Sequence, residues 1–144
     1  MSRTRIRGSL CFLIIFQACA SGQAVNPVPQ QAPQVDICSL IREPQMYDGR
    51  VVRVDAEARA GAHYEILLSG KSCSEAVVVL SIPKDLDDDE SLARLRESVF
   101  KGFPGTTARA EATLVGRFKW HQDQVPARVL KLAEVVAVNT LHEN

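Results

Sequence analysis

One segment with helical spacing stands among five segments with strand patterning, and this order constrains the fold more than any other feature. A strand with one buried face alternates apolar and polar side chains, whereas a helix repeats its apolar positions every three or four residues. The predicted strands are residues 51–60, 63–69, 76–82, 108–119 and 127–138, and the predicted helix is residues 88–100. The helix starts with acidic and ends with basic side chains, as the helix dipole favours.

This order predicts a particular small barrel. An immunoglobulin-like sandwich needs about seven strands, and a ferredoxin-like sheet places its helices between other pairs of strands. Three strands, a helix and two strands match the OB-fold, a five-stranded Greek-key barrel. We therefore predict a mainly β, OB-like barrel with its longer helix between the third and fourth strands. The third strand is expected to be buried on both faces, and Gly116 predicts a bulge or a barrel corner in the fourth.

The first 20 residues have the pattern of an export signal. Three arginines at positions 3, 5 and 7 precede an apolar run, residues 10–16, which is shorter than a membrane-spanning helix. Two processing routes stay open: cleavage after Ala20 releases a soluble chain, whereas residues 16–19 resemble a lipoprotein box that would make Cys19 a lipidated first residue. Residues 21–35, rich in Pro and Gln, are predicted to form a flexible spacer before a domain at 36–140.

Charge argues against nucleic acid as a partner. The chain has 17 basic and 17 acidic residues, and removal of the three arginines of the signal leaves 14 basic against 17 acidic residues. Binding to phosphate backbones depends on clustered Lys and Arg side chains. An acidic mature domain is therefore not expected to bind DNA or RNA.

Two cysteines remain for the folded domain. Of the four, Cys11 lies in the signal and Cys19 is removed or lipidated, which leaves Cys38 and Cys73. In an oxidising compartment these two are expected to pair. A metal or redox site is the alternative, but neither cysteine has a Cys-x-x-Cys or histidine partner at ligand spacing. A disulfide across 35 positions should stabilise the fold by about 3 to 4 kcal/mol.

The segment around Cys38 predicts a short helix. Asp36 is placed to cap it, and Pro44 is placed to end it. Asp48-Gly49 then predicts the turn into the first strand. The stretch CSLIREPQMYDGRVVRVDAEA, together with the second cysteine in GKSCSE, resembles small exported bacterial domains of unknown function with an OB-like barrel. The resemblance implies the same fold and a two-cysteine clamp, and it implies no reaction.

Two loops hold the candidate ligand-binding residues. OB-folds bind through the face of strands two and three and through the loops that join strands one to two and four to five. Here those loops carry aromatic, basic and amide groups suited to stacking on a sugar or base. The candidates are His63, Tyr64, Lys119, Trp120 and His121. In the alternative interpretation, Tyr64 and Trp120 only cover the barrel ends.

Neither catalysis nor metal binding has a motif in the chain. Residues 85–90 are rich in acids but fail as a calcium loop, since Glu90 stands where glycine is needed, and they suit a helix start better. The histidines at 63, 121 and 142 belong to no nucleophile or zinc motif. We therefore expect no metal, no cofactor and no enzyme activity.

These patterns predict an exported, non-catalytic binding or interaction module of the cell envelope, periplasmic or secreted, with an envelope protein or a glycan as partner. Under the lipoprotein route, Cys19 also anchors it to a membrane. The alternative function is an envelope hydrolase with its site near His63 or His121, and a third hypothesis is a structural accessory of a larger assembly.

Overall fold

The computed structural model describes residues 32–105 and 108–141. The predicted export signal with Cys19, most of the predicted spacer and His142 lie outside the described residues. Within the described residues, no helix is long and apolar enough to cross a membrane.

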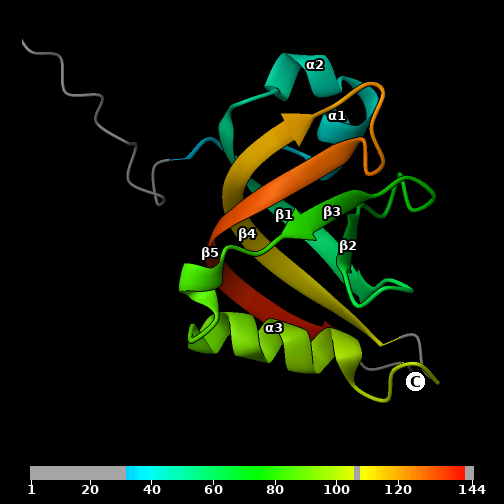
Figure 1. Ribbon diagram of the computed structural model, residues 1–144, viewed down its shortest axis with the longest axis vertical. Coiled ribbons are helices and arrows are strands. Elements are labelled where there is room, and N and C mark those ends of the chain that lie inside the picture. The colour runs from blue at the N-terminus through cyan, green and yellow to red at the C-terminus, as the bar shows by residue number, and fades with distance from the viewer. Residues whose placement is uncertain (1–31, 106–107, 142–144) are drawn as a thin grey trace, which may run out of the picture.

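Five strands close into a barrel in the order β1-β2-β3-β5-β4 (Figure 1). They are β1 (Val51–Ala60), β2 (Ile66–Ser69), β3 (Val78–Ser81), β4 (Arg109–Trp120) and β5 (Arg128–Leu141). All neighbours are antiparallel except β3 and β5, which are parallel. The helix α3 (Glu90–Phe100) follows the short 3₁₀ turn η2 (Lys84–Leu86) and lies between β3 and β4 in the sequence. The predicted OB-like barrel, with one longer helix between its third and fourth strands, is confirmed.

Alternation of side chains places one face of each strand in the core. Along β1, the apolar side chains of Val52, Val54, Ala56 and Ala58 are buried, and the charged side chains between them face outward. Helix α3 packs across one end of the barrel and buries its apolar positions at Leu92, Leu95 and Val99. The hydrophobic effect therefore fixes which charged side chains each strand presents to solvent.

One prediction about burial is wrong. The third strand was expected to be buried on both faces, but β3 alternates, with Val78 and Leu80 buried and Ser81 exposed. A small closed barrel has a single interior, and α3 caps its end instead of covering the outside of β3. The apolar run at residues 76–82 therefore did not indicate a strand buried on both faces.

The predicted bulge in the fourth strand is confirmed. The pairing of β4 with β5 shifts register between Thr113 and Leu114 and again between Val115 and Gly116. At Gly116 an added Cβ would lie 2.6 Å from the backbone oxygen of Lys131 on β5. Glycine therefore allows the close approach of two strands at this bend.

The N-terminal segment folds onto β1. Helix α1 (Ile37–Arg42) is capped by Asp36, whose Oδ1 accepts a hydrogen bond of 3.1 Å from the backbone N–H of Cys38. A second short helix, α2 (Pro44–Tyr47), begins at the proline that was predicted to end the first. The chain pairs with β1 before residue 36, since the backbone N–H of Val35 donates to the carbonyl of Arg53 at 2.8 Å.

The predicted disulfide is confirmed. Cys38 in α1 is bonded to Cys73 in the loop between β2 and β3, with a Cα–Cα distance of 5.7 Å. Cys38 is buried, whereas Cys73 is partly exposed. The bond therefore holds an outer loop against the N-terminal helix, and it is consistent with an oxidising location outside the cytoplasm.

Candidate functional site

The two loops that carry the predicted ligand residues lie at opposite ends of the β1–β4 ladder (Figure 1). That ladder runs from the pair Val51–Arg117 to the pair Arg59–Arg109. The loop at 61–65 follows the second end, and the loop at 121–127 follows the first. At about 3.3 Å per residue, the nine pairs span roughly 26 Å. Tyr64 and Trp120 therefore do not form one stacking pair for a ligand.

Tyr64 belongs to an aromatic cluster beside the end of α3. Its ring centroid lies 5.0 Å from that of Phe103 and 6.2 Å from that of Phe100. Its side chain is 73% exposed and its backbone has a φ of 64°, which is unusual for a residue other than glycine. Beside it, the backbone N–H of His63 donates to Glu65 at 2.7 Å. The ligand-binding roles of His63 and Tyr64 stay predictions.

The other three candidates lie where β4 ends. The Trp120 side chain is partly buried against the core, and its backbone N–H donates to Asp48 Oδ1 at 3.0 Å. The backbone N–H of His121 donates to the carbonyl of Ala127 at 2.8 Å, which closes the loop to β5. The Lys119 side chain is exposed. The packing of Trp120 agrees with a cover for the barrel end, and the ligand roles of these three residues also stay predictions.

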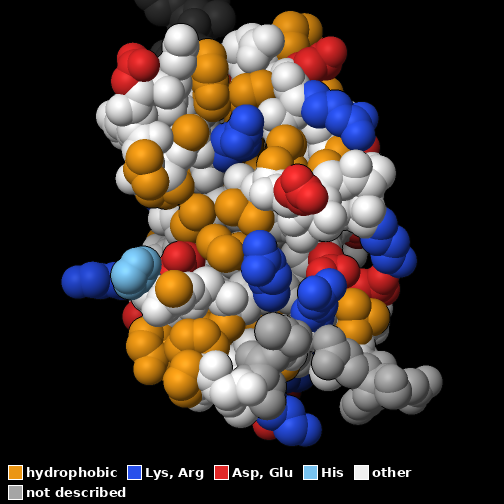
Figure 2. Space-filling view, turned by 90° about the vertical axis from the view of Figure 1, so that its right-hand side faces the viewer, with side chains coloured by type: hydrophobic (Ala, Val, Ile, Leu, Met, Phe, Trp, Pro, Cys, Tyr) orange, Lys and Arg blue, Asp and Glu red, His pale blue; other side chains and the backbone are white. Residues whose placement is uncertain are grey.

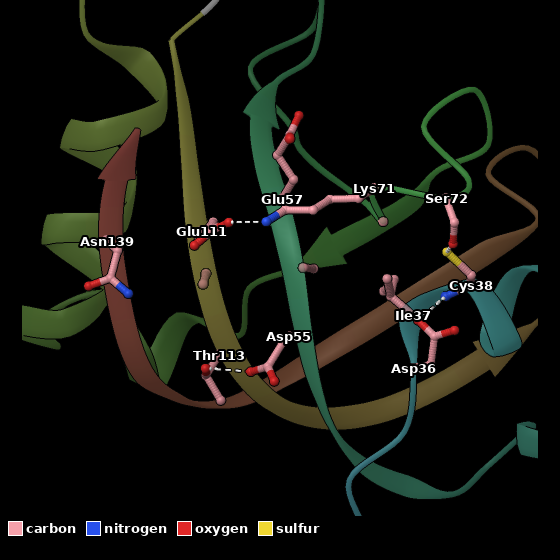
Figure 3. A pocket seen from close by; sticks show the side chains of 13 residues that line it. Asp36, Ile37, Cys38, Asp55, Glu57, Lys71, Ser72, Glu111, Thr113 and Asn139 are labelled. Carbon is pink, nitrogen blue, oxygen red and sulfur yellow. Dashed lines mark hydrogen bonds and ion pairs between the residues drawn. The ribbon is translucent and has the colours of Figure 1, made fainter. Parts of the chain in front are cut away.

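A groove of about 570 Å³ lies elsewhere, between the N-terminal helix, the β2–β3 loop and the outer face of the barrel (Figure 3). No pattern in the sequence indicated this groove. Its walls come from five segments: the start of α1, β1, the β2–β3 loop, β4 and β5. The lining residues are Asp36, Ile37, Cys38, Asp55, Ala56, Glu57, Gly70, Lys71, Ser72, Glu111, Ala112, Thr113 and Asn139.

Strand register aligns the polar side chains along the floor of this groove. Glu57 on β1 is paired with Glu111 on β4, which is paired in turn with Asn139 on β5. Two residues away, Asp55 is paired with Thr113. Since side chains two residues apart in a strand share a face, both rows lie on the outside of the barrel. The outward charges were visible in the sequence, but the pairing that brings them together was not.

The disulfide supports one wall of the groove. Gly70 lies so close to the bridge that an added Cβ would come within 2.5 Å of Cys38 Sγ. The Ser72 hydroxyl also contacts Cys38 Sγ at 3.2 Å. The loop that carries Lys71 therefore rests directly on the bonded sulfurs, and the bond helps to fix the shape of the groove.

Four carboxylates and one lysine give the groove a negative balance. Two of the carboxylates, Glu57 and Glu111, stand directly opposite each other, an arrangement that destabilises a strand pair. Two exposed ion pairs offset this repulsion: Lys71 Nζ lies 2.9 Å from Glu111 Oε1, and Arg109 Nη1 lies 2.9 Å from Glu57 Oε1. The face drawn in Figure 2 likewise shows basic and acidic side chains next to one another near its middle.

The ion pair changes the titration of Lys71. The hydrogen bond from its ammonium group to Glu111 raises the pKa of Lys71 above 10.5, and the charges of Glu111 and Glu57 act in the same direction. Figure 3 shows the Lys71 side chain extended over β1 toward Glu111. The groove thus holds a primary ammonium group of the protein itself.

The other two carboxylates are occupied by structural hydrogen bonds. Asp55 accepts from the Thr113 hydroxyl at 2.6 Å and from Gln34 Nε2 at 3.0 Å, one bond to each oxygen. Asp36 uses Oδ1 to cap α1. Within residues 32–105 and 108–141, the second carboxylate oxygens of Glu57 and Glu111 have no hydrogen-bond partner in the structure. The Glu111 side chain is 41% exposed and the Glu57 side chain 18%, so that Glu111 is the more accessible of the two to a ligand.

The arrangement suits binding through charge and hydrogen bonds. In the part of the chain that the structure describes, no group of three His, Cys, Asp or Glu side chains is placed to hold a metal ion. Neither His63 nor His121 lines the groove.

Comparison of the chain with protein-family models gives no match, and comparison with curated proteins gives none either. The resemblance to small exported OB-like domains therefore stays a prediction.

Proposed function

We propose that this protein is an exported, non-catalytic binding module of the cell envelope and that the groove is its binding site. The observation that carries the proposal is a concave site of about 570 Å³ whose walls come from five segments of the fold. Binding sites of proteins commonly have volumes of about 300 to 1,000 Å³ and a few polar groups that orient the ligand. The groove has both properties.

The covalent framework supports a binding role. The disulfide and the closed barrel hold the walls of the groove in place before a ligand arrives. Preorganisation of this kind lowers the entropy lost on association. The same bond, together with the signal-like pattern of residues 1–20, supports export to an oxidising compartment.

The chemistry of the groove favours binding over hydrolysis. A hydrolytic site needs a nucleophile or an activated water beside a general base. The carboxylates of the groove are engaged by Lys71, Arg109, Thr113, Gln34 and the α1 backbone. The hydrolase hypothesis places its site near His63 or near His121, and neither residue lines the groove.

Nuclear magnetic resonance of the oxidised, secreted protein tests the proposal. The probes are chitin oligosaccharides and pentapeptides of net charge +2, 0 and −2, each titrated into ¹⁵N-labelled protein. We expect at least one probe to shift the amide signals of Glu57, Lys71 and Glu111 in a saturable way. If the shifts are confined to the loops at 61–65 and 121–127, the groove is not the site. If no probe shifts any signal, the proposed binding role is refuted for these ligand classes.

A further inference from the structure

We propose that the groove binds a lysine-bearing peptide segment and that Lys71 occupies the same position in the free protein. This inference rests on the proposed function and names the ligand class of that site.

The charge of the groove is complementary to that of a lysine side chain. The groove is lined by four carboxylates, and Lys71 is the one basic side chain among its lining residues. The carboxylates belong to Asp36, Asp55, Glu57 and Glu111. A cleft lined mainly by one sign of charge raises the local concentration of ligands of the opposite sign. Because Asp36 and Asp55 are held by structural hydrogen bonds and the Glu57 side chain is paired with Arg109 and only 18% exposed, Glu111 is the group that meets the cation.

The pairing of Glu57 with Glu111 costs stability. Two glutamates directly opposite each other on antiparallel strands destabilise the sheet, and neutral polar side chains would not. Departures from locally favourable sequence are concentrated at functional sites. In the free protein Arg109 and Lys71 relieve this repulsion, Arg109 at Glu57 and Lys71 at Glu111, and a cation of a ligand can take the place of Lys71.

A ligand can displace the Lys71 side chain. Its side chain is 83% exposed and extends from a loop, so that its ion pair with Glu111 is open to solvent. Ion pairs of this kind contribute little to stability and exchange readily. A lysine of a bound peptide can therefore take over the contact with Glu111, while Thr113 and Asn139 beside it offer hydrogen bonds to the peptide backbone.

Titration of the oxidised protein with two matched peptides tests the inference. The first is acetyl-Gly-Lys-Gly-Lys-Gly-amide, and the second replaces both lysines with norleucine, which keeps the stem and removes the charge. We expect the lysine peptide to shift the groove amides and the norleucine peptide to bind at least about tenfold more weakly. Binding of the lysine peptide should weaken as the salt concentration rises, because ions screen exposed charges.

Three variants complete the test. Glu111→Gln should weaken binding of the lysine peptide about fivefold. The control Glu134→Gln removes a carboxylate of β5 outside the groove and should leave the affinity for this peptide unchanged. Lys71→Met should tighten binding about two- to fivefold, because the competing ammonium is gone. Far-ultraviolet circular dichroism of each variant confirms that the fold is kept.

The outcomes separate this inference from the proposed function. Equal binding of the lysine and norleucine peptides, or weaker binding by Lys71→Met, overturns the inference even though the groove is still a binding site. If chitin oligosaccharides shift the amide signals of the groove and the lysine peptide does not, the site binds a glycan and the inference is also overturned. If no probe shifts the amide signals of the groove, both the inference and the proposed function are refuted.

Discussion

Replacing Cys73 with serine removes the covalent bond between α1 and the β2–β3 loop and should destabilise the domain. Cys73 is partly exposed, so that the new hydroxyl stays in contact with water. Cys38 remains as a buried thiol, which a hydrophobic core tolerates. The expected loss of stability therefore comes mainly from the bond itself.

The magnitude follows from the length of chain that the bond closes. The two cysteines are 35 residues apart in the sequence. In the chain-entropy model, a loop of this length restricts the unfolded chain by about 4 kcal/mol at 25 °C. For a domain of about 110 residues, this corresponds to a fall in Tm of about 15 °C.

Urea denaturation, followed by circular dichroism, measures the effect on the free energy of unfolding. The wild type and Cys73→Ser are compared with and without a dithiol reductant. In the oxidised state we expect a difference of about 4 kcal/mol, and the m-value of the variant should be larger because its unfolded state is more expanded. In the reduced state the two proteins should unfold at nearly the same urea concentration.

Two results would refute this reasoning. If the oxidised wild type and Cys73→Ser differ by less than about 1 kcal/mol, the constraint on the unfolded chain is not what stabilises the domain. If the difference persists under reducing conditions, the serine itself is responsible, and the half-buried site is more sensitive to side-chain chemistry than its exposure indicates.

Three further predictions concern single side chains. Gly116→Ala should destabilise the domain by about 1–3 kcal/mol in urea denaturation, because the new methyl would meet the neighbouring strand. Asp89→Ala should cost about 1 kcal/mol by the same assay, because Asp89 Oδ1 caps α3, and Asp88→Ala, whose side chain is not the cap, should cost much less; equal losses would contradict the capping role. In a ¹³C titration, Glu111→Gln should lower the pKa of Lys71 toward 10.5. Since the folded-state pKa of Lys71 is raised, its ion pair contributes fully below pH 10.5 and is lost as the pH rises through the raised value. An unchanged pKa in the variant would contradict the assigned cause.

The mainly β fold was predictable because its signals are local. Alternation along residues 51–60 fixed a strand with one buried face, and Val52 and Val54 are buried as that pattern requires. The helix was predicted at 88–100 and begins two residues later, at Glu90, with Asp89 as its cap. The disulfide was predictable because only two cysteines remain after the signal-like segment.

The candidate site was not predictable in the same way. The predicted loops were grouped by analogy with other barrels, but the β1–β4 register places Tyr64 and Trp120 at opposite ends of the ladder. The groove depends on Glu57 and Glu111 being paired across strands that are 54 positions apart in the sequence. Nothing in either strand alone specifies that partner.

The sequence by itself determined which side chains face inward along β1, where the longer helix begins to within two residues, and which cysteines join. The periodicity of apolar side chains and the helix cap act within short stretches of chain. The cysteine pair follows because only two cysteines remain after the signal-like segment. Only the tertiary structure decided that the outward polar side chains of β1, β4 and β5 meet beneath the β2–β3 loop. The physical reason is that strand register and barrel closure are set by long-range packing, which brings together side chains that the sequence keeps far apart.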